Sequence, residues 1–346
     1  MIGAATADRG QAPQRPEEFE ALRLLSLRLG RDPTQVQGAG GNTSLKEGDV
    51  LFVKASGVWL GEVDQREGFV AVDRARLTRD FREDPSRTED PKPYAMAGET
   101  LRPSIETTLH AALPQRVVLH THSVDAIARL STGDPGDALA ALDGMDTVRP
   151  ALVPYARPGL PLTLAVLEAL REGTNVLLLG NHGVVVAADS VAKADALLWA
   201  VTSRLEDAPR SGPERDRSVD DAWRKAGYVP VPSPDGRAQH LATDAESTAI
   251  ATSGSLYPDH VVFLGRGLTL AEGPGTLAEE PVVALHPGHG YFIRESAGRA
   301  AEAMALCLAD VALRATGVPR PLSRDDEDAL LGWDAEKHRQ KLEAGR

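Results

Sequence analysis

The chain has 346 residues, with 38 Lys and Arg against 50 Asp and Glu, and its formal net charge at pH 7 is −12. This surplus of negative charge argues against a surface for nucleic acid or anionic membranes, because both bind clustered positive charge. The length is sufficient for one substantial core and a smaller second unit.

Cysteine content and the first residues bear on the compartment. The single cysteine, Cys307, excludes an internal disulfide framework and fits a reducing environment. It lies in the apolar stretch 300–307, which has the spacing of a helix face, so we expect it in the core. Residues 1–16 contain no apolar segment typical of a signal peptide, and no run in the chain reaches the length of a membrane span. We therefore expect a cytoplasmic protein.

Residues 38–44 combine three glycines with Asn42, Thr43 and Ser44. Glycines permit positive φ and bare backbone amides, and the three polar side chains add short donors, so the segment can form a nest for phosphate or another anion. It has neither the Gly-Lys-Ser/Thr ending of a P-loop nor the dinucleotide signature G-x-G-x-x-G. A simple turn between two strands is the alternative interpretation.

A helix is predicted over 103–113, which opens with a capping residue and carries apolar side chains at helical spacing. Glu106 and His110 are four residues apart and share one face of that helix. From there the Glu106 carboxylate can serve a metal pocket as a ligand and as a proton acceptor, with His110 as its support. The alternative for Glu106 is a solvated helix residue.

Three histidines are candidate metal ligands. The apolar run before His120-Thr121-His122 predicts a β-strand, in which His120 and His122 point to the same face. His182 follows a second apolar run, 175–179, and the glycines on either side of 181–182 allow a tight bend. Three neutral imidazoles suit zinc, cobalt, nickel or iron, and three protein ligands with a vacant position are typical of catalytic zinc. Structural histidines are the alternative.

The remaining chain divides into further elements. A helix capped by 189–190 is expected to run through Val201, followed by a charged linker at 206–217 that Pro and Gly interrupt. A short α/β module follows. Its predicted elements are a helix at 238–252, strands at 260–264, 281–285 and 291–294, and a helix at 297–315. The two histidines in 286–290 are interpreted as part of a turn, since Pro and Gly separate them, and the tail 325–346 as a helix on a neighbouring subunit or a frayed end.

Five motifs together resemble the class II aldolase/adducin family. They are residues 40–44 (GGNTS), 54–57 (KASG), 103–106 (PSIE), 120–122 (HTH) and 181–183 (NHG). Their order and spacing match the family over residues 17–207. Segments 30–33, 153–159 and 256–262 are similar to the aldolase part of bifunctional rhamnulose-phosphate aldolase/dehydrogenase proteins.

The resemblance implies an α/β fold with three αβα layers and a central, mainly antiparallel sheet. It implies a metal-dependent catalytic domain at 17–207 and a C-terminal extension at 208–346, comprising the small α/β module and the charged tail. Enzymes of this family are usually tetramers, so a homo-oligomer is expected.

The site residues that the resemblance implies fall into three groups. Zn²⁺, or another divalent transition metal, is expected on His120, His122 and His182, and Glu106 is the expected acid/base. The expected phosphate-binding residues are Asn42, Thr43, Ser56, Gly57 and Ser104. Two departures from the family pattern stand out. Ile105 replaces a second serine, and no tyrosine lies in 138–148 to supply the aldehyde-side proton, for which Tyr155 is a poor substitute.

The implied function is a zinc-dependent aldolase that cleaves a ketose phosphate or similar keto compound by a retro-aldol reaction, with Glu106 as acid/base and the metal stabilising the enediolate. The expected partner is a small-molecule sugar phosphate, and neither nucleic acid nor a membrane. An epimerase or a decarboxylase of the same family is the alternative, because the fold does not fix the reaction. A non-catalytic scaffold like adducin is disfavoured, since the three histidines and Glu106 are all present.

Overall fold

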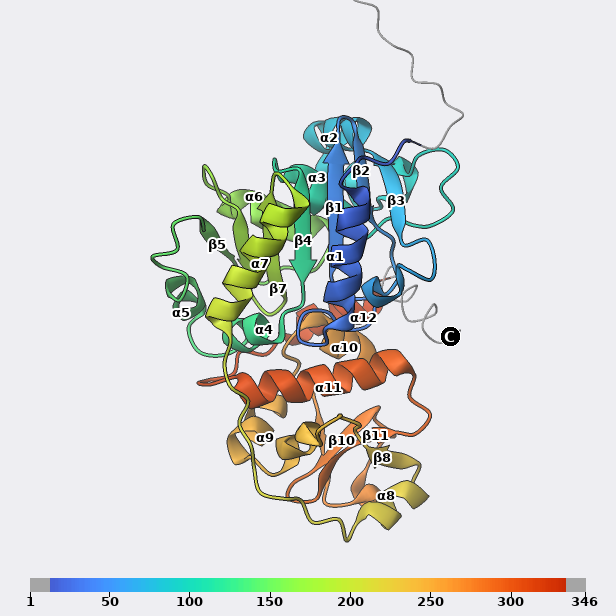
Figure 1. Cartoon of the computed structure of the whole chain (residues 1–346). Helices are drawn as coiled ribbons and strands as arrows, with labels where there is room; N and C mark the ends of the chain where they lie inside the picture. The colour runs from blue at the N-terminus through green and yellow to red at the C-terminus, as the bar shows by residue number, and fades with distance from the viewer. Residues whose placement is uncertain (1–12, 334–346) are drawn as a thin grey trace, which may run out of the picture.

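The computed structural model describes residues 13–333 and contains two β-sheets (Figure 1). The larger has seven strands in the order β3-β2-β1-β4-β7-β6-β5. Its strands are β1 Asn42–Glu47, β2 Val50–Lys54, β3 Phe69–Asp73, β4 Val117–Thr121, β5 Pro150–Val153, β6 Val176–Leu179 and β7 Gly183–Ala188. Only β5 and β6 pair in parallel; the other neighbours are antiparallel. The predicted mainly antiparallel sheet is confirmed.

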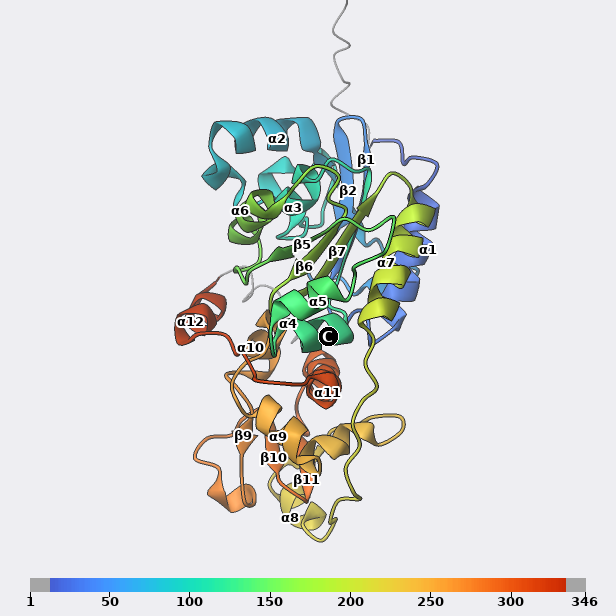
Figure 2. The same ribbon diagram turned by 90° about the vertical axis from the view of Figure 1, so that its left-hand side faces the viewer.

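Helices cover both faces of this sheet (Figure 2). One face carries α1 Phe19–Arg31 and α7 Val191–Leu205; the other carries α2 Arg74–Glu83, α3 Thr107–Ala112 and α6 Leu160–Ala169. Each face has its own core, with Leu22 and Leu198 on the first and Leu109 and Val166 on the second. The predicted αβα layering is therefore confirmed. Ser190 caps α7 as expected, because its side chain accepts a hydrogen bond from the Lys193 amide.

The smaller sheet has the order β8-β11-β10-β9 and belongs to the C-terminal module, defined here as residues 220–333. Its strands are β8 Tyr228–Pro230, β9 Thr269–Leu270, β10 Val283–His286 and β11 Gly290–Arg294. The accompanying helices are α8 Asp220–Lys225, α9 Ala245–Ala251, α10 Pro258–Leu264, α11 Arg299–Arg314 and α12 Arg324–Gly332. The predicted helix at 297–315 and the strands at 281–285 and 291–294 are confirmed with small shifts in their ends.

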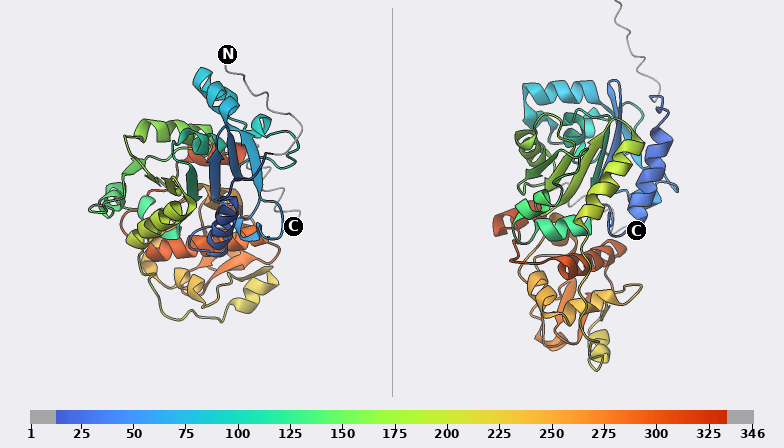
Figure 3. Two further views of the ribbon diagram at one scale, coloured as in Figure 1. Left: turned by 45° about the horizontal axis from the view of Figure 1, so that its top comes forward. Right: turned by 60° about the vertical axis from the view of Figure 1, so that its left-hand side comes forward.

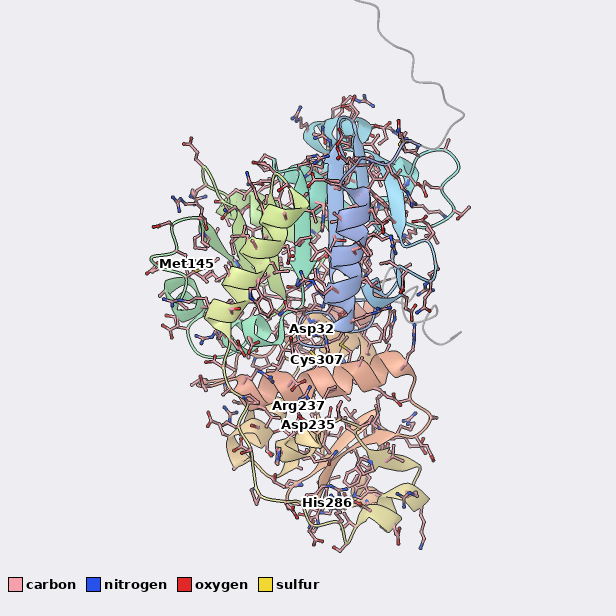
Figure 4. The ribbon with its side chains drawn as sticks, viewed as in Figure 1. Asp32, Met145, Asp235, Arg237, His286 and Cys307 are labelled. Atoms are coloured by element: carbon pink, nitrogen blue, oxygen red, sulfur yellow. The ribbon has the colours of Figure 1, made fainter. Side chains whose placement is uncertain are left out.

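Helix α11 lies between the two sheets, and the views in Figure 3 agree on this placement. It packs against α4 Val124–Leu130, which with α5 Pro135–Ala140 closes the lower end of the large sheet. Val124 and Ile127 of α4 share one hydrophobic cluster with Met304 and Leu308 of α11. Cys307 is also buried in α11, as expected (Figure 4). The module is thus joined to the larger part through a continuous apolar core.

Two predictions for the module are wrong. Residues 260–264 form part of α10 and not a strand, because Pro258 takes the first helical position, where its fixed φ is favourable and no amide is lost. A five-residue apolar run is equally compatible with a strand or a helix, so periodicity alone could not separate them. The predicted helix at 238–252 is split into a 3₁₀ segment, Arg237–Ala242, and α9, since Asp244 caps α9 by accepting from Ser247.

Other parts of the described chain complete the fold. Single 3₁₀ turns occur at Leu60–Glu62, Pro85–Thr88, Lys92–Tyr94 and Pro274–Thr276. Residues 206–217, the predicted linker, form neither helix nor strand. In the tail, α12 covers part of the predicted helix, and residues 334–346 lie outside the described range. Within residues 13–333, every helix is too short or too polar to cross a membrane.

The turn after β6 depends on a glycine. A Cβ atom at Gly183 would lie 2.2 Å from the carbonyl oxygen of Thr121 on the neighbouring strand β4. We expect Gly183→Ala to lower the free energy of unfolding by about 1–3 kcal/mol or more, because the β4–β7 pair must separate to relieve this overlap. Urea unfolding measures the change.

Gly275→Ala is the matched control, since no atom lies within 4 Å of the added methyl group. Equal stability of the two variants would contradict the close approach at Gly183.

Candidate metal centre

Three histidine rings meet at one end of β4. His120 lies on β4, His122 directly follows it, and His182 lies in the turn between β6 and β7. One ring nitrogen from each lies within 4.8 Å of the other two. The ring centroids are 5.0 Å apart for His120 and His122, 4.8 Å for His120 and His182, and 5.0 Å for His122 and His182. All three side chains are buried. The structure therefore brings the three predicted ligands together.

Strand pairing explains this convergence. His120 pairs with Asn42 of β1 on one side and with Val185 of β7 on the other. The β6–β7 turn then returns the chain beside the end of β4, with Asn181 in the left-handed region at φ 53°. Asn tolerates this conformation better than most residues, so His182 can reach His120 across a very short loop.

The ring of His120 is oriented by the backbone. Its Nδ1 lies 3.1 Å from the Val184 carbonyl oxygen and donates a hydrogen bond to it. The lone pair is then on Nε2, which is buried and has no hydrogen-bond partner among residues 13–333. A ring that donates through one nitrogen to a carbonyl and presents the other inward has the arrangement of a metal ligand.

Glu106 supplies a carboxylate to the same point. Its Oε2 lies 3.5 Å from His120 Nε2 and accepts a hydrogen bond from Asn42 Nδ2 at 2.7 Å, and its Oε1 lies 3.8 Å from His182 Nε2. The prediction that Glu106 shares a helix face with His110 is wrong, because Glu106 is the residue before α3 and lies outside the helix. That position aims its side chain along the sheet toward the rings.

His110 has a different neighbour. Its Nδ1 lies 2.7 Å from the Ser44 hydroxyl oxygen, and the ring is fully buried. Burial lowers the pKa of His110 to about 3, so the ring is uncharged at neutral pH. His110 packs behind the centre and is not among the residues that line the pocket described below.

The charge states suit metal binding. Burial alone would raise the pKa of Glu106, but the His120 and His182 rings and the Asn42 amide outweigh it and hold that pKa at about 2. Burial lowers the pKa of His182 to about 3 and also lowers the pKa of His120. At neutral pH these pKa shifts favour uncharged rings at His120 and His182 and an ionised carboxylate at Glu106, which are the protonation states that metal ligands require.

These groups fit a divalent transition metal. Imidazole nitrogen and carboxylate oxygen are ligands of Zn²⁺ and similar ions. Glu106 Oε1, like His120 Nε2, is buried without a hydrogen-bond partner in the described part of the chain. Buried polar atoms of this kind are costly unless something binds them, and a cation satisfies both.

A pocket opens beside the rings of His122 and His182, both of which line it. Four of the predicted phosphate-binding residues line it: Asn42, Ser56, Gly57 and Ser104. Ile105, which stands where a second serine was expected, also lines the pocket and presents an apolar side chain there.

Thr43 departs from the prediction. Successive strand residues point to opposite faces, so Thr43 on β1 turns away from Asn42. Its hydroxyl lies 2.7 Å from that of Ser26 on α1, where both side chains are fully buried. Thr43 therefore joins α1 to the sheet and is not among the residues that line the pocket.

A buried lysine holds the glycine-rich loop. Lys54 Nζ donates hydrogen bonds to the carbonyl oxygens of Ala39 at 2.5 Å and Gly41 at 2.8 Å. Lys54 also lines the pocket, so its positive charge lies at the predicted anion site. The sequence motif contained this lysine, but its spacing did not indicate that the side chain would bind the loop.

The pocket offers no tyrosine, among the residues described, to supply the aldehyde-side proton. The side chain of Tyr155 packs instead against the apolar cluster of Val261, Leu322 and Leu330.

Sequence reasoning missed one carboxylate of the site. Asp259, on α10 of the C-terminal module, lines the pocket, and its Oδ2 lies 3.1 Å from His122 Nδ1. The other ring nitrogen of His122 lies 3.4 Å from the Gly41 amide. The sequence Pro258-Asp259 is typical of a helix start, but it carries no signal that Asp259 would meet His122.

His286 and His289 lie elsewhere. Figure 4 shows His286 at the far end of the module, where it is the last residue of β10 before the turn to β11. Its Nδ1 accepts a hydrogen bond from Trp223 Nε1 at 3.4 Å. The one group of metal-ligating side chains found within residues 13–333 does not include them.

A comparison with protein families matches residues 24–206 to the class II aldolase and adducin N-terminal domain. Among curated proteins, the chain is 33% identical over 192 residues to the uncharacterized oxidoreductase YuxG of Bacillus subtilis (strain 168). That alignment covers 51% of this chain and 27% of YuxG, so the chain spans about a quarter of that relative's length.

Two further relatives are each similar to about half of the chain. The chain is 30% identical over 176 residues to the 3-oxo-tetronate 4-phosphate decarboxylase of Escherichia coli (strain K12), covering 45% of this chain and 70% of the relative. Among solved structures, the N-terminal class II aldolase domain of a conserved protein from Thermoplasma acidophilum superposes with a TM-score of 0.48 at 27% identity, covering 57% of this chain and 97% of that one.

The buried histidines make stability depend on pH. Burial lowers the pKa of His110 and His182 to about 3 and that of His260 to about 4, against 6.5 in the unfolded chain. Below about pH 6.5 the unfolded chain binds protons that the folded chain does not, so stability falls as pH decreases toward 4. We expect the metal-free protein to lose at most about 1.4 kcal/mol per pH unit for each such histidine.

Urea unfolding at pH 6.5 and pH 5 measures this loss. His260→Gln, which removes one titrating ring away from the metal centre, should flatten the dependence. An unfolding free energy that stays constant over this range would contradict the lowered pKa values, because it would mean that the folded and unfolded chains bind equal numbers of protons.

Proposed function

The chain belongs to the class II aldolase and adducin family, and from this premise we propose that it is a metal-dependent carbon–carbon lyase. The proposed substrate is a ketose phosphate or a related keto compound, which the enzyme cleaves by a retro-aldol reaction. The proposed metal is Zn²⁺, held by His120, His122 and His182.

One observation carries the proposal. The carboxylate of Glu106 contacts two of the three converging imidazoles, and a pocket opens directly beside them. A non-catalytic scaffold would have no use for buried carboxylate and imidazole atoms without hydrogen-bond partners in the described structure, since each costs stability.

The side chains divide the chemistry among them. When bound, a divalent ion would stabilise the negative charge that develops on the substrate when a bond next to its carbonyl breaks. Glu106 is ionised at neutral pH, so it accepts a proton from the substrate and returns it to the carbon at which the bond broke. Asn42 holds the carboxylate in place through its hydrogen bond to Oε2.

The pocket also suits an anionic substituent. Ser56, Ser104 and Lys54 line it together with the backbone of Gly57, which has a φ of 71°. Hydroxyl groups and backbone amides are donors that bind phosphate, and the positive charge of Lys54, whose Nζ donates to the loop carbonyls, attracts it. We therefore place the substrate phosphate beside these residues.

Decarboxylation is the second candidate. One relative in the family is named as a decarboxylase of a 3-oxo-tetronate 4-phosphate. Retro-aldol cleavage needs two proton transfers, one from the hydroxyl of the departing aldehyde and one to the carbon left behind, whereas loss of CO₂ from a carboxylate needs only the second. Among the described residues no tyrosine lines the pocket. This feature favours a substrate that needs proton transfer at only one carbon.

Metal binding is the first test of the proposal. We expect about one zinc-like ion per chain in the wild type and none in His122→Ala, because two imidazoles alone bind more weakly. Glu106→Gln should keep the metal and lose turnover by at least 10²-fold, since the amide cannot accept the proton. Elemental analysis and steady-state kinetics give the two results. Unchanged turnover in Glu106→Gln would remove this residue from the mechanism.

A substrate panel separates the reactions. We expect ketose 1-phosphates to release dihydroxyacetone phosphate in a coupled assay if the enzyme is an aldolase. Phosphorylated 3-oxo acids that release CO₂ would assign a decarboxylase instead, and an epimerised product without cleavage would assign an epimerase. Glu106→Gln serves as the control for each activity.

A further inference from the structure

We infer that Asp259, from the C-terminal module, is a positioning residue of the metal centre and holds the ring of His122. The inference rests on the proposed function, because it concerns how the protein binds its metal. It gives the module a role within the active site.

Asp259 and His122 are in direct side-chain contact. Asp259 Oδ2 lies 3.1 Å from His122 Nδ1, and the two residues are only 3% and 7% exposed. A carboxylate that accepts from one ring nitrogen fixes the ring and makes the other nitrogen a stronger metal ligand. That other nitrogen has a 3.4 Å contact with the Gly41 amide, which is longer than an ordinary hydrogen bond and therefore easily displaced by a metal ion.

The glycine-rich loop leaves room for the contact between Asp259 and His122, because Gly40 has no side chain. A Cβ atom at Gly40 would lie 2.6 Å from His122 Nδ1 and 2.9 Å from Asp259 Oδ2. Only glycine allows the ring and the carboxylate to meet there, and Lys54 holds the carbonyl groups on either side of Gly40.

A second contact ties the module to the site. Asn181, next to His182, donates from Nδ2 to the carbonyl oxygens of Leu256 at 3.0 Å and Arg320 at 2.8 Å. Leu256 lies three residues before Asp259. The module therefore contacts His122 directly and the turn that carries His182 through Asn181.

Asp259 is carried by a rigid element. Pro258 occupies the first position of α10, and the Leu256 amide donates to His260 Nδ1 at 3.3 Å, which closes the turn before the helix. Behind it, Val261 packs with Leu322 and Leu330. Side chains on packed helices are positioned more narrowly than side chains on loops, as a ligand-orienting group requires.

Charge balance agrees with this assignment. Glu106 and Asp259 bring two carboxylates to one buried group of three imidazoles. Two buried carboxylates so close together are unfavourable unless positive charge offsets them. Lys54, which lines the same pocket, supplies one positive charge, and a divalent cation supplies the rest.

The experiment compares metal affinities. Co²⁺ and Zn²⁺ dissociation constants are measured on the full chain by competition with a chromophoric chelator. We expect Asp259→Asn to bind about 10- to 100-fold more weakly than the wild type, and Asp259→Glu to recover part of that loss. The Co²⁺ absorption bands of Asp259→Asn should shift, because a neutral amide holds the ring of His122 less strongly than a carboxylate does.

Glu327→Gln is the matched control. Glu327 is a buried carboxylate of the same module that accepts a hydrogen bond from Ser255 at 2.6 Å, so its loss perturbs the module without touching His122. Its affinity and Co²⁺ spectrum should equal those of the wild type.

The outcomes are distinct. Wild-type affinity in Asp259→Asn, or equal losses in Asp259→Asn and Glu327→Gln, would overturn the inference while the proposed function stands. A wild type that binds neither ion would instead overturn the proposed function.

Discussion

The contact between a buried carboxylate and buried imidazoles is the constraint on which the rest of the structure depends. Glu106 and the three histidine rings are held away from water, where each would be costly if left without partners. The rings stay buried because β4 is paired with a strand on each side, which fixes the backbone that carries them. The Asn42 amide and the Val184 carbonyl satisfy the atoms that face outward from the centre, so the remaining ones point inward.

Strand pairing and strand ends divide the work of building the site. β4, between β1 and β7, fixes His120 by its register. The other groups lie next to the ends of regular elements: His122 directly after β4, His182 in the turn between β6 and β7, and Glu106 just before α3. Regular elements thus supply rigidity, while the residues next to them have the backbone freedom to turn side chains to one point.

Much of the fold and of the site followed from local patterns. The spacing of His120 and His122 predicted a shared face, the glycines around His182 predicted a bend, and both features are present. Thr43 was misplaced because a motif had been treated as a unit, although alternate strand residues face opposite sides. The 260–264 segment was misassigned because five apolar residues suit a strand or a helix equally. Asp259 was missed since it lies 137 residues beyond His122, and no local pattern relates the two.

The contact between α10 and the metal centre also bears on which parts of the chain can be gained or lost in evolution. Parts of a chain that meet only through a linker can be exchanged or lost independently. Here the two parts share an apolar core and meet at the rings, so a duplication or fusion event that carried residues 24–206 alone would arrive with an exposed α4 and an unsupported His122. In this chain the sheet and α10 therefore depend on each other for the packing of α4 and for the position of His122.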